Sequence, residues 1–263
     1  MAHTPKALSS AKPQKPASPA PSRKAARNRT SKRRTYIRSA PRQHVPNSRH
    51  HWKEYLPAEK ALDLVEAATH AHTIGLPLNQ AVAIHFERGE LPDIYRPQDA
   101  IHYWLKAAGQ WLRNRGVQMT FIWVIEQAIG TGIHVHILLH CPPQHQKEFF
   151  KKGRTSWLLK AGMSQKDKRT LHNQRVGPRG YEVGTASKYD HGSYQRQLKG
   201  ALRYHLKAIS PDQAAPRLTG SDKPFAELFG IEPEYSHPIY GRRASQSQNI
   251  SKKARDKYHA KRA

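Results

Sequence analysis

The feature that most constrains the fold is a pair of apolar, β-rich runs within residues 117–140, VQMTFIWVIEQAIGTGIHVHILLH. A short loop containing Gly130 and Gly132 joins the two runs, and this pattern predicts a β-hairpin. In the second run, alternate residues point to opposite faces of the strand. One face carries Ile133, Val135, Ile137 and Leu139, and the other carries His134, His136, Leu138 and His140. We therefore expect a sheet with one buried, aliphatic face.

Burial of an aliphatic face does not require two imidazoles on the opposite face. His134 and His136 lie about 7 Å apart along a strand and can present nitrogens to one cation. A metal site needs a further ligand, and Glu126 is the natural candidate, because the hairpin returns the chain past it. A polar face hydrogen-bonded to its neighbours or to water would also explain the pair. His140, four residues after His136 and about 13 Å from it along the strand, is expected to be solvated or to support the site indirectly, and His85 to be a packed polar residue.

The chain is strongly basic, with 45 lysines and arginines against 19 acidic residues and a formal charge of +26. An acidic polymer or surface is the expected partner. Residues 1–53 contain 14 basic and no acidic residues, and residues 241–263 contain eight basic residues and one acidic residue. Residues 1–45 also have few large aliphatic side chains, which predicts a disordered arm. Such an arm could bind phosphates or act as a solubilising tail.

These changes in composition predict three parts: a disordered basic arm over residues 1–45, a folded domain over 46–240, and a disordered basic tail over 241–263. The single cysteine, Cys141, excludes an internal disulfide framework and a cysteine-rich zinc module. No apolar run approaches the roughly 20 residues that span a bilayer, and the N-terminus lacks the apolar region of a secretory signal. We therefore expect a soluble, cytoplasmic protein with no membrane partner.

Apolar periodicity predicts helices over residues 57–70 and 99–114, a strand over 81–86 and a polar helix over 144–151. Residues 181–187, YEVGTAS, are a candidate strand within a stretch, residues 164–193, that otherwise shows no clear pattern. The chain has no Walker-type glycine loop, so a fused helicase is not expected.

A further helix is expected over residues 193–210, SYQRQLKGALRYHLKAIS, with Ser193 as its N-cap. At about 100° per residue, four basic side chains fall in a stripe about 80° wide, and they are Arg196, Lys199, Arg203 and Lys207. The core face carries Leu198, Leu202, Leu206 and Ile209. Tyr204 lies beside the basic stripe and away from the leucines, where it can approach a phosphate. Tyr194, ten residues earlier on this helix, is a candidate second nucleophile.

The order of these residues resembles that of the HUH endonucleases, specifically the Rep-type initiators of rolling-circle replication in plasmids and phages. The resemblance rests on Glu126, on His134-Val135-His136 in an apolar strand, and on Tyr204-His205-Leu206-Lys207 on a helix. The stretch GLPLNQAVAIHF, residues 75–86, is similar to the family's first strand motif. The resemblance covers residues 75–210 and implies an α+β fold. In this fold a central antiparallel sheet with flanking helices carries the histidines on a middle strand, against which the tyrosine helix packs.

The resemblance also implies a reaction on single-stranded DNA at a replication origin. A divalent ion, Mg²⁺ or Mn²⁺, held by His134, His136 and Glu126 would polarise the scissile phosphate. Tyr204 would attack it, leaving a 5′-phosphotyrosine and a free 3′-hydroxyl that a polymerase extends. Lys207 would steady the phenolate or phosphate charge, and the rest of the basic stripe would contact the DNA. A separate helicase would have to open the duplex.

Two other functions remain open from the residues alone. One is a catalytically silent protein of the same fold that binds single-stranded nucleic acid through its basic helix and tails. The other is an unrelated zinc hydrolase that uses His134, His136 and a carboxylate, because two imidazoles also accept zinc or another transition metal.

Overall fold

The computed structural model describes residues 52–91 and 97–262, apart from the side chains of residues 217 and 218. The arm predicted for residues 1–45 and the predicted start of the domain at residue 46 lie outside these ranges. Among the described residues, no helix is both long and apolar enough to cross a membrane.

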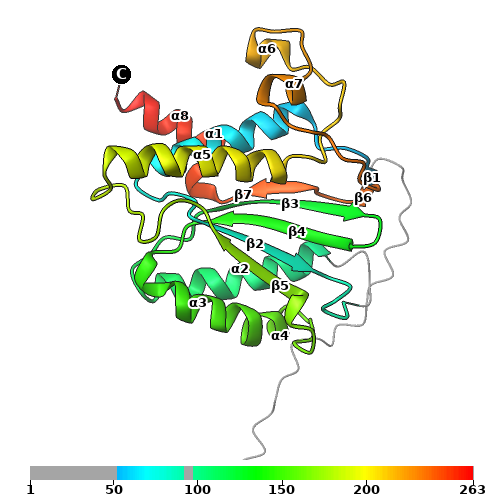
Figure 1. Ribbon diagram of the computed structural model, residues 1–263, viewed down its shortest axis with the longest axis vertical. Helices are drawn as coiled ribbons and strands as arrows, with labels where there is room; N and C mark the ends of the chain where they lie inside the picture. Colours follow the sequence, from blue (N-terminus) through cyan, green and yellow to red (C-terminus); the bar gives the residue numbers. More distant parts are fainter. Residues whose placement is uncertain (1–51, 92–96, 263) are drawn as a thin grey trace, which may run out of the picture. The chain divides into compact units, whose positions relative to one another are not determined.

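The centre of the fold is a five-stranded antiparallel sheet with the strand order β5-β2-β4-β3-β7 (Figure 1). The strands are β2 (Gln80–His85), β3 (Phe121–Ala128), β4 (Gly132–Leu139), β5 (Leu171–Arg175) and β7 (Ala244–Gln246). The hairpin predicted within residues 117–140 is β3 and β4, and β4 is the middle strand. This arrangement confirms a mixed α+β fold with a central antiparallel sheet. A separate two-stranded sheet pairs β1 (Trp52–Lys53) with β6 (Ile239–Tyr240).

One face of the sheet is covered by α2 (Pro97–Arg113) and by a continuous helical stretch (Figure 1). That stretch consists of α3 (Gln146–Lys152), a π-helical turn (Gly153–Trp157) and α4 (Leu158–Lys160). The helix α2 buries its apolar stripe, including Trp104 and Leu112, against Val135 and Ile137 of β4. The predicted aliphatic face of the hairpin is therefore the face that packs against α2.

The opposite face is also covered, by α1 (Ala58–Thr73) and α5 (Lys188–His205) (Figure 1). Leu138 of β4 is fully buried there with Ile122 and Val124 of β3, in the same cluster as Leu198 and Leu202 of α5. The expectation of a single buried face is therefore wrong. The sheet is the middle of three layers, and His134 and His136 lie on the same face as Leu138.

Helix α5 begins six residues earlier than its sequence pattern predicts. Its N-cap is Ser187, whose hydroxyl accepts a hydrogen bond from Asp190 N at 3.1 Å, rather than Ser193. This geometry satisfies one of the backbone N–H groups that have no partner within the helix. The helix ends at His205, and the predicted core residues Leu198, Leu202, Leu206 and Ile209 are all buried.

Residues 244–260 are part of the fold, so the prediction of a disordered tail over residues 241–263 is wrong for the residues that the structure describes. Strand β7 extends the sheet beside β3, a 3₁₀ turn follows (Gln248–Ile250), and α8 (Lys252–Ala260) contacts α1. The only buried residue of α8 is Arg255, which forms ion pairs with Asp63 at 2.7 Å and Glu66 at 2.8 Å. Helix α8 therefore packs against the fold through a charged residue. A search for apolar periodicity does not detect such a helix.

Residues 164–193 also differ from their sequence interpretation. The strand lies at Leu171–Arg175, and residues 181–187, which were the candidate strand, form no strand. A 3₁₀ turn (Lys168–Thr170) precedes β5. The remaining short elements are a 3₁₀ turn (Pro143–His145), α6 (Pro216–Thr219) and α7 (Phe225–Phe229).

Candidate metal and nucleophile site

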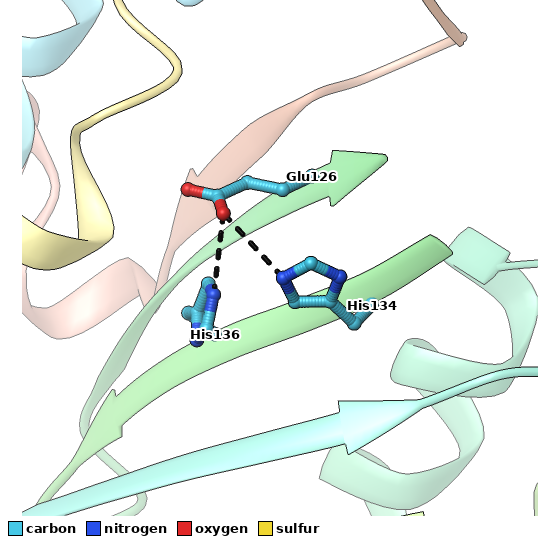
Figure 2. Close-up of side chains that lie close together, drawn as sticks. All are labelled: Glu126, His134 and His136. Carbon is cyan, nitrogen blue, oxygen red and sulfur yellow. Dashed lines mark ion pairs between the residues drawn. The ribbon is translucent and has the colours of Figure 1, made fainter. Parts of the chain in front are cut away.

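The hairpin brings Glu126, His134 and His136 together on the face that packs against α5. Glu126 on β3 is paired directly with His134 on β4, and His136 follows two residues later on the same face. Figure 2 shows the three side chains pointing toward one another. Glu126 Oε2 is 3.5 Å from His134 Nε2 and 3.3 Å from His136 Nε2, and one possible ligand atom from each residue lies within 4.8 Å of the others. All three side chains are buried.

The hydrogen-bonding state of this cluster is compatible with a cation site. His134 Nδ1 is 3.0 Å from Gly132 O, and a carbonyl only accepts, so Nδ1 carries a proton. A second proton on Nε2 or a cation between Nε2 and the Glu126 carboxylate would each make this close contact favourable. Glu126 Oε1 and His136 Nε2 are buried and make no hydrogen bond to any described residue. Within the described part of the chain, this is the only group of three or more His, Cys, Asp or Glu residues whose possible ligand atoms lie close enough to hold one metal ion.

The charge state of the cluster also suits a cation. Burial alone would raise the pKa of the Glu126 carboxyl, but the imidazoles of His134 and His136 and the ammonium of Lys207 hold this pKa at about 2. Burial lowers the pKa of His136, although Glu126 beside it acts in the opposite direction. For Glu126 and His136 these shifts favour a carboxylate and a neutral imidazole, the forms in which these groups bind a metal ion. Three protein ligands leave coordination positions for water or substrate.

Tyr204 and Lys207 lie at this cluster, brought there by the C-terminal end of α5. The ring centroid of Tyr204 is 5.0 Å from that of His136, and the tyrosine is 53% exposed. Lys207 Nζ lies 4.6 Å from the Tyr204 ring centroid and 3.7 Å from Glu126 Oε2. An exposed phenol, a cation and the buried Glu126–His134–His136 cluster therefore share one location, as expected from the hairpin and the helix. Their chemical roles remain predictions.

These residues line a cavity of ≈ 1030 Å³ between α5 and the sheet edge formed by β2 and β5. Its lining includes His134, His136, Tyr204 and Lys207, and the β5 wall contributes polar side chains such as Asn173 and Arg175.

The three remaining basic residues predicted to bind DNA do not line this cavity. Arg196, Lys199 and Arg203 are exposed on α5, and Arg203 Nε donates to Phe229 O at 2.8 Å. The structure therefore places them beside the site and not in it, and their contact with DNA stays a prediction.

Two further predicted residues have structural positions. Tyr194 is fully buried in a stack with Tyr181, with ring centroids 4.5 Å apart and an interplanar angle of 9°, and burial raises its pKa. The suggestion that Tyr194 is a second nucleophile is therefore wrong. His140 is buried and is not solvated. Its Nδ1 lies 2.9 Å from Pro77 O, so its side chain links the end of β4 to the segment before β2.

Two histidines beside the ligands complete the surroundings of the cluster. His85 on β2 is stacked on His134 with ring centroids 5.2 Å apart, and burial lowers its pKa to about 4. The expectation that His85 is a packed residue agrees with this position. His205, which the sequence analysis did not single out, is buried with its ring 5.1 Å from His136, and its Nδ1 donates to Ala201 O at 2.6 Å. Its position directly after Tyr204 in the sequence could have indicated that it lies near the site.

Comparison of the chain with family models, curated proteins and solved structures finds no match.

Proposed function

We propose that this protein cleaves and rejoins single-stranded DNA with a divalent metal ion, through a 5′-phosphotyrosine on Tyr204, and thereby initiates rolling-circle replication. The observation that carries the proposal is the position of Tyr204, an exposed phenol whose ring lies 5.0 Å from that of His136 in the Glu126–His134–His136 cluster. The formal charge of +26 supports a polyanionic substrate. The choice of DNA and of replication rests on the resemblance to the HUH endonucleases.

Each side chain has a distinct role in this proposal. The Tyr204 oxygen attacks the phosphorus as its proton is lost, the bond from phosphorus to the 3′-oxygen breaks, and the 3′-oxygen takes up a proton. Lys207 stabilises negative charge on the phenolate and the phosphate. Glu126, His134 and His136 would hold the ion, which supplies Lewis-acid polarisation of the phosphate. Rejoining reverses these steps when a 3′-hydroxyl attacks the phosphotyrosine.

The position of each group fits its role. The three ligands are buried and fixed on paired strands, so their geometry does not depend on a flexible loop. Tyr204, by contrast, is exposed at the cavity, where a long strand can reach it without entering the core. Mg²⁺ or Mn²⁺ is expected from the resemblance, and two imidazole ligands favour Mn²⁺ over Mg²⁺.

A zinc hydrolase is the second candidate, favoured by the donor set itself. Two histidines and one glutamate with open coordination positions are also typical of catalytic zinc. In that reaction a metal-activated water would attack the substrate, and Tyr204 would form no covalent bond.

A labelled single-stranded oligonucleotide that carries the replicon's origin, incubated with Mn²⁺, tests the proposal. We expect a covalent protein–DNA adduct that survives denaturing electrophoresis and disappears in Tyr204→Phe. The matched control is Tyr189→Phe, because Tyr189 lies on the same helix and is 77% exposed, and it should form the adduct normally. Glu126→Gln should lose cleavage and keep salt-sensitive DNA binding.

Two results would decide against the proposal. An adduct that persists in Tyr204→Phe would remove this tyrosine as the nucleophile. Tightly bound zinc in the purified protein, together with no adduct under any metal condition, would favour the hydrolase.

A further inference from the structure

Lys207 lies between two carboxylates in the absence of substrate. Its Nζ is 2.7 Å from Glu234 Oε2 and 3.7 Å from Glu126 Oε2. Two negative charges therefore face one positive charge at the position where a phosphate is expected to bind. Because the side chain of Lys207 is only 12% exposed, water screens this arrangement less than it would screen a surface pair.

The two carboxylates differ in their freedom to move. Glu126 is 2% exposed and is fixed on β3 as a metal ligand, whereas the side chain of Glu234 is 61% exposed. The backbone around Glu234 is nevertheless held in place. Glu234 N donates to Lys207 O at 2.8 Å, and Ser236 Oγ accepts hydrogen bonds from Gln127 N and Arg243 Nη1, each at 3.0 Å. The Glu234 side chain can therefore rotate into solvent without moving the segment that carries it.

A phosphodiester at Tyr204 would meet the Glu234 carboxylate on the same ammonium group. Glu234 and Lys207 both line the cavity that contains Tyr204. Two like charges that share one cation repel each other, and the more exposed of the two is displaced at lower cost because water solvates it.

We propose that Glu234 occupies the phosphate-binding position of Lys207 in the free protein and is displaced by the backbone phosphate of a single-stranded nucleic acid. A ligand must therefore supply enough binding free energy to displace the Glu234 carboxylate from Lys207. This competition weakens the binding of an isolated phosphate more than that of a strand, which makes many other contacts. The inference deepens the proposed function, since it rests on Lys207 as a phosphate contact.

The test is a double-mutant cycle of DNA binding in EDTA, where metal-dependent cleavage does not interfere. Wild type, Glu234→Gln, Lys207→Gln and the double variant are titrated with a short fluorescent single-stranded oligonucleotide. Glu234→Gln should bind about two- to fivefold more tightly than wild type, the range expected when an ion pair whose carboxylate is 61% exposed no longer competes. In the Lys207→Gln background the same substitution should have no effect. Glu232→Gln, an exposed residue two positions away, removes the same charge and should change binding by less than half of that gain.

Three results would overturn the inference. These are an equal gain in the Lys207→Gln background, an equal gain in Glu232→Gln, and weaker binding in Glu234→Gln, which would make Glu234 a support for Lys207. Should Lys207→Gln fail to fold, Lys207→Arg replaces it, and the gain should then persist, because arginine also binds both phosphate and carboxylate. A binding gain without any adduct would refute only the proposed function, and an adduct without the gain would refute only the inference.

Discussion

Substitution of Arg255 by methionine should destabilise the protein by about 2–3 kcal/mol. The guanidinium donates to Asp63 Oδ1 at 2.7 Å, Glu66 Oε2 at 2.8 Å and Ile250 O at 2.9 Å, and the side chain is 7% exposed. Methionine keeps the apolar contacts of the stem and removes all three bonds. The loss is smaller than for an isolated buried pair, which costs about 3–5 kcal/mol when one partner is removed.

The structure explains why the loss is reduced. Asp63 keeps hydrogen bonds from Lys60 and Gln246, each at 2.7 Å, so its charge stays paired. The side chain of Glu66 is 53% exposed, and water replaces its lost partner. Most of the lost stability therefore comes from two hydrogen bonds, the one to the Ile250 carbonyl and the charge-assisted one to Asp63.

Urea unfolding followed by circular dichroism measures this effect as a decrease in the transition midpoint without a change in slope. The matched control is Lys252→Met, which removes an exposed cation from the same helix. Lys252 pairs with Asp256 at 2.8 Å, and its side chain is 75% exposed, so the expected change is below about 0.5 kcal/mol. Equal, small effects of both substitutions would refute the conclusion that α8 is a packed part of the fold.

Two further predictions concern buried groups next to the sheet. Burial raises the pKa of the Cys141 thiol to about 12, so its alkylation by iodoacetamide at pH 8 should be at least about a hundredfold slower in the folded protein than in urea; equal rates would contradict this burial. Burial lowers the pKa of His140, so its neutral form contributes stability fully above the unfolded pKa of about 6.5, and that contribution is lost as the pH falls below it. The unfolding free energy should therefore decrease from pH 7.5 to pH 5, and less so in His140→Gln; an identical decrease in the two proteins would exclude His140 as a source.

The parts of the fold that follow from sequence are those with local periodicity. Alternation in residues 133–139 identified β4, and the i, i+3, i+4 spacing around Trp104 and Leu112 identified α2. The same local rules placed His134 and His136 on one face and Tyr204 away from the leucines of α5. The hairpin then determined that Glu126 lies opposite His134.

The parts that could not be predicted depend on partners distant in sequence. Only Leu171 of β5 is buried, so this strand shows no apolar alternation and is defined by its backbone pairing with β2. Arg255 of α8 is buried through acidic partners on α1, about 190 positions away. Within the site, the ion pair between Glu234 and Lys207 likewise joins residues 27 positions apart through a loop. Patterns within a short stretch of sequence do not predict contacts between residues that are far apart along the chain.

The edge position of β7 has a consequence for how the protein is made. Strand β3, which carries Glu126, acquires its second neighbour only through its pairing with β7, in which even Val124 and Ala244, the pair nearest in sequence, are 120 positions apart. During synthesis, β3 therefore emerges long before its partner, and an apolar edge stays open to other chains. We expect chaperone binding and aggregation to be greatest in this interval. Fragments that end before residue 244 should associate through the unpaired edge of β3. The Glu126 carboxylate would then lie on an edge strand and not inside the sheet.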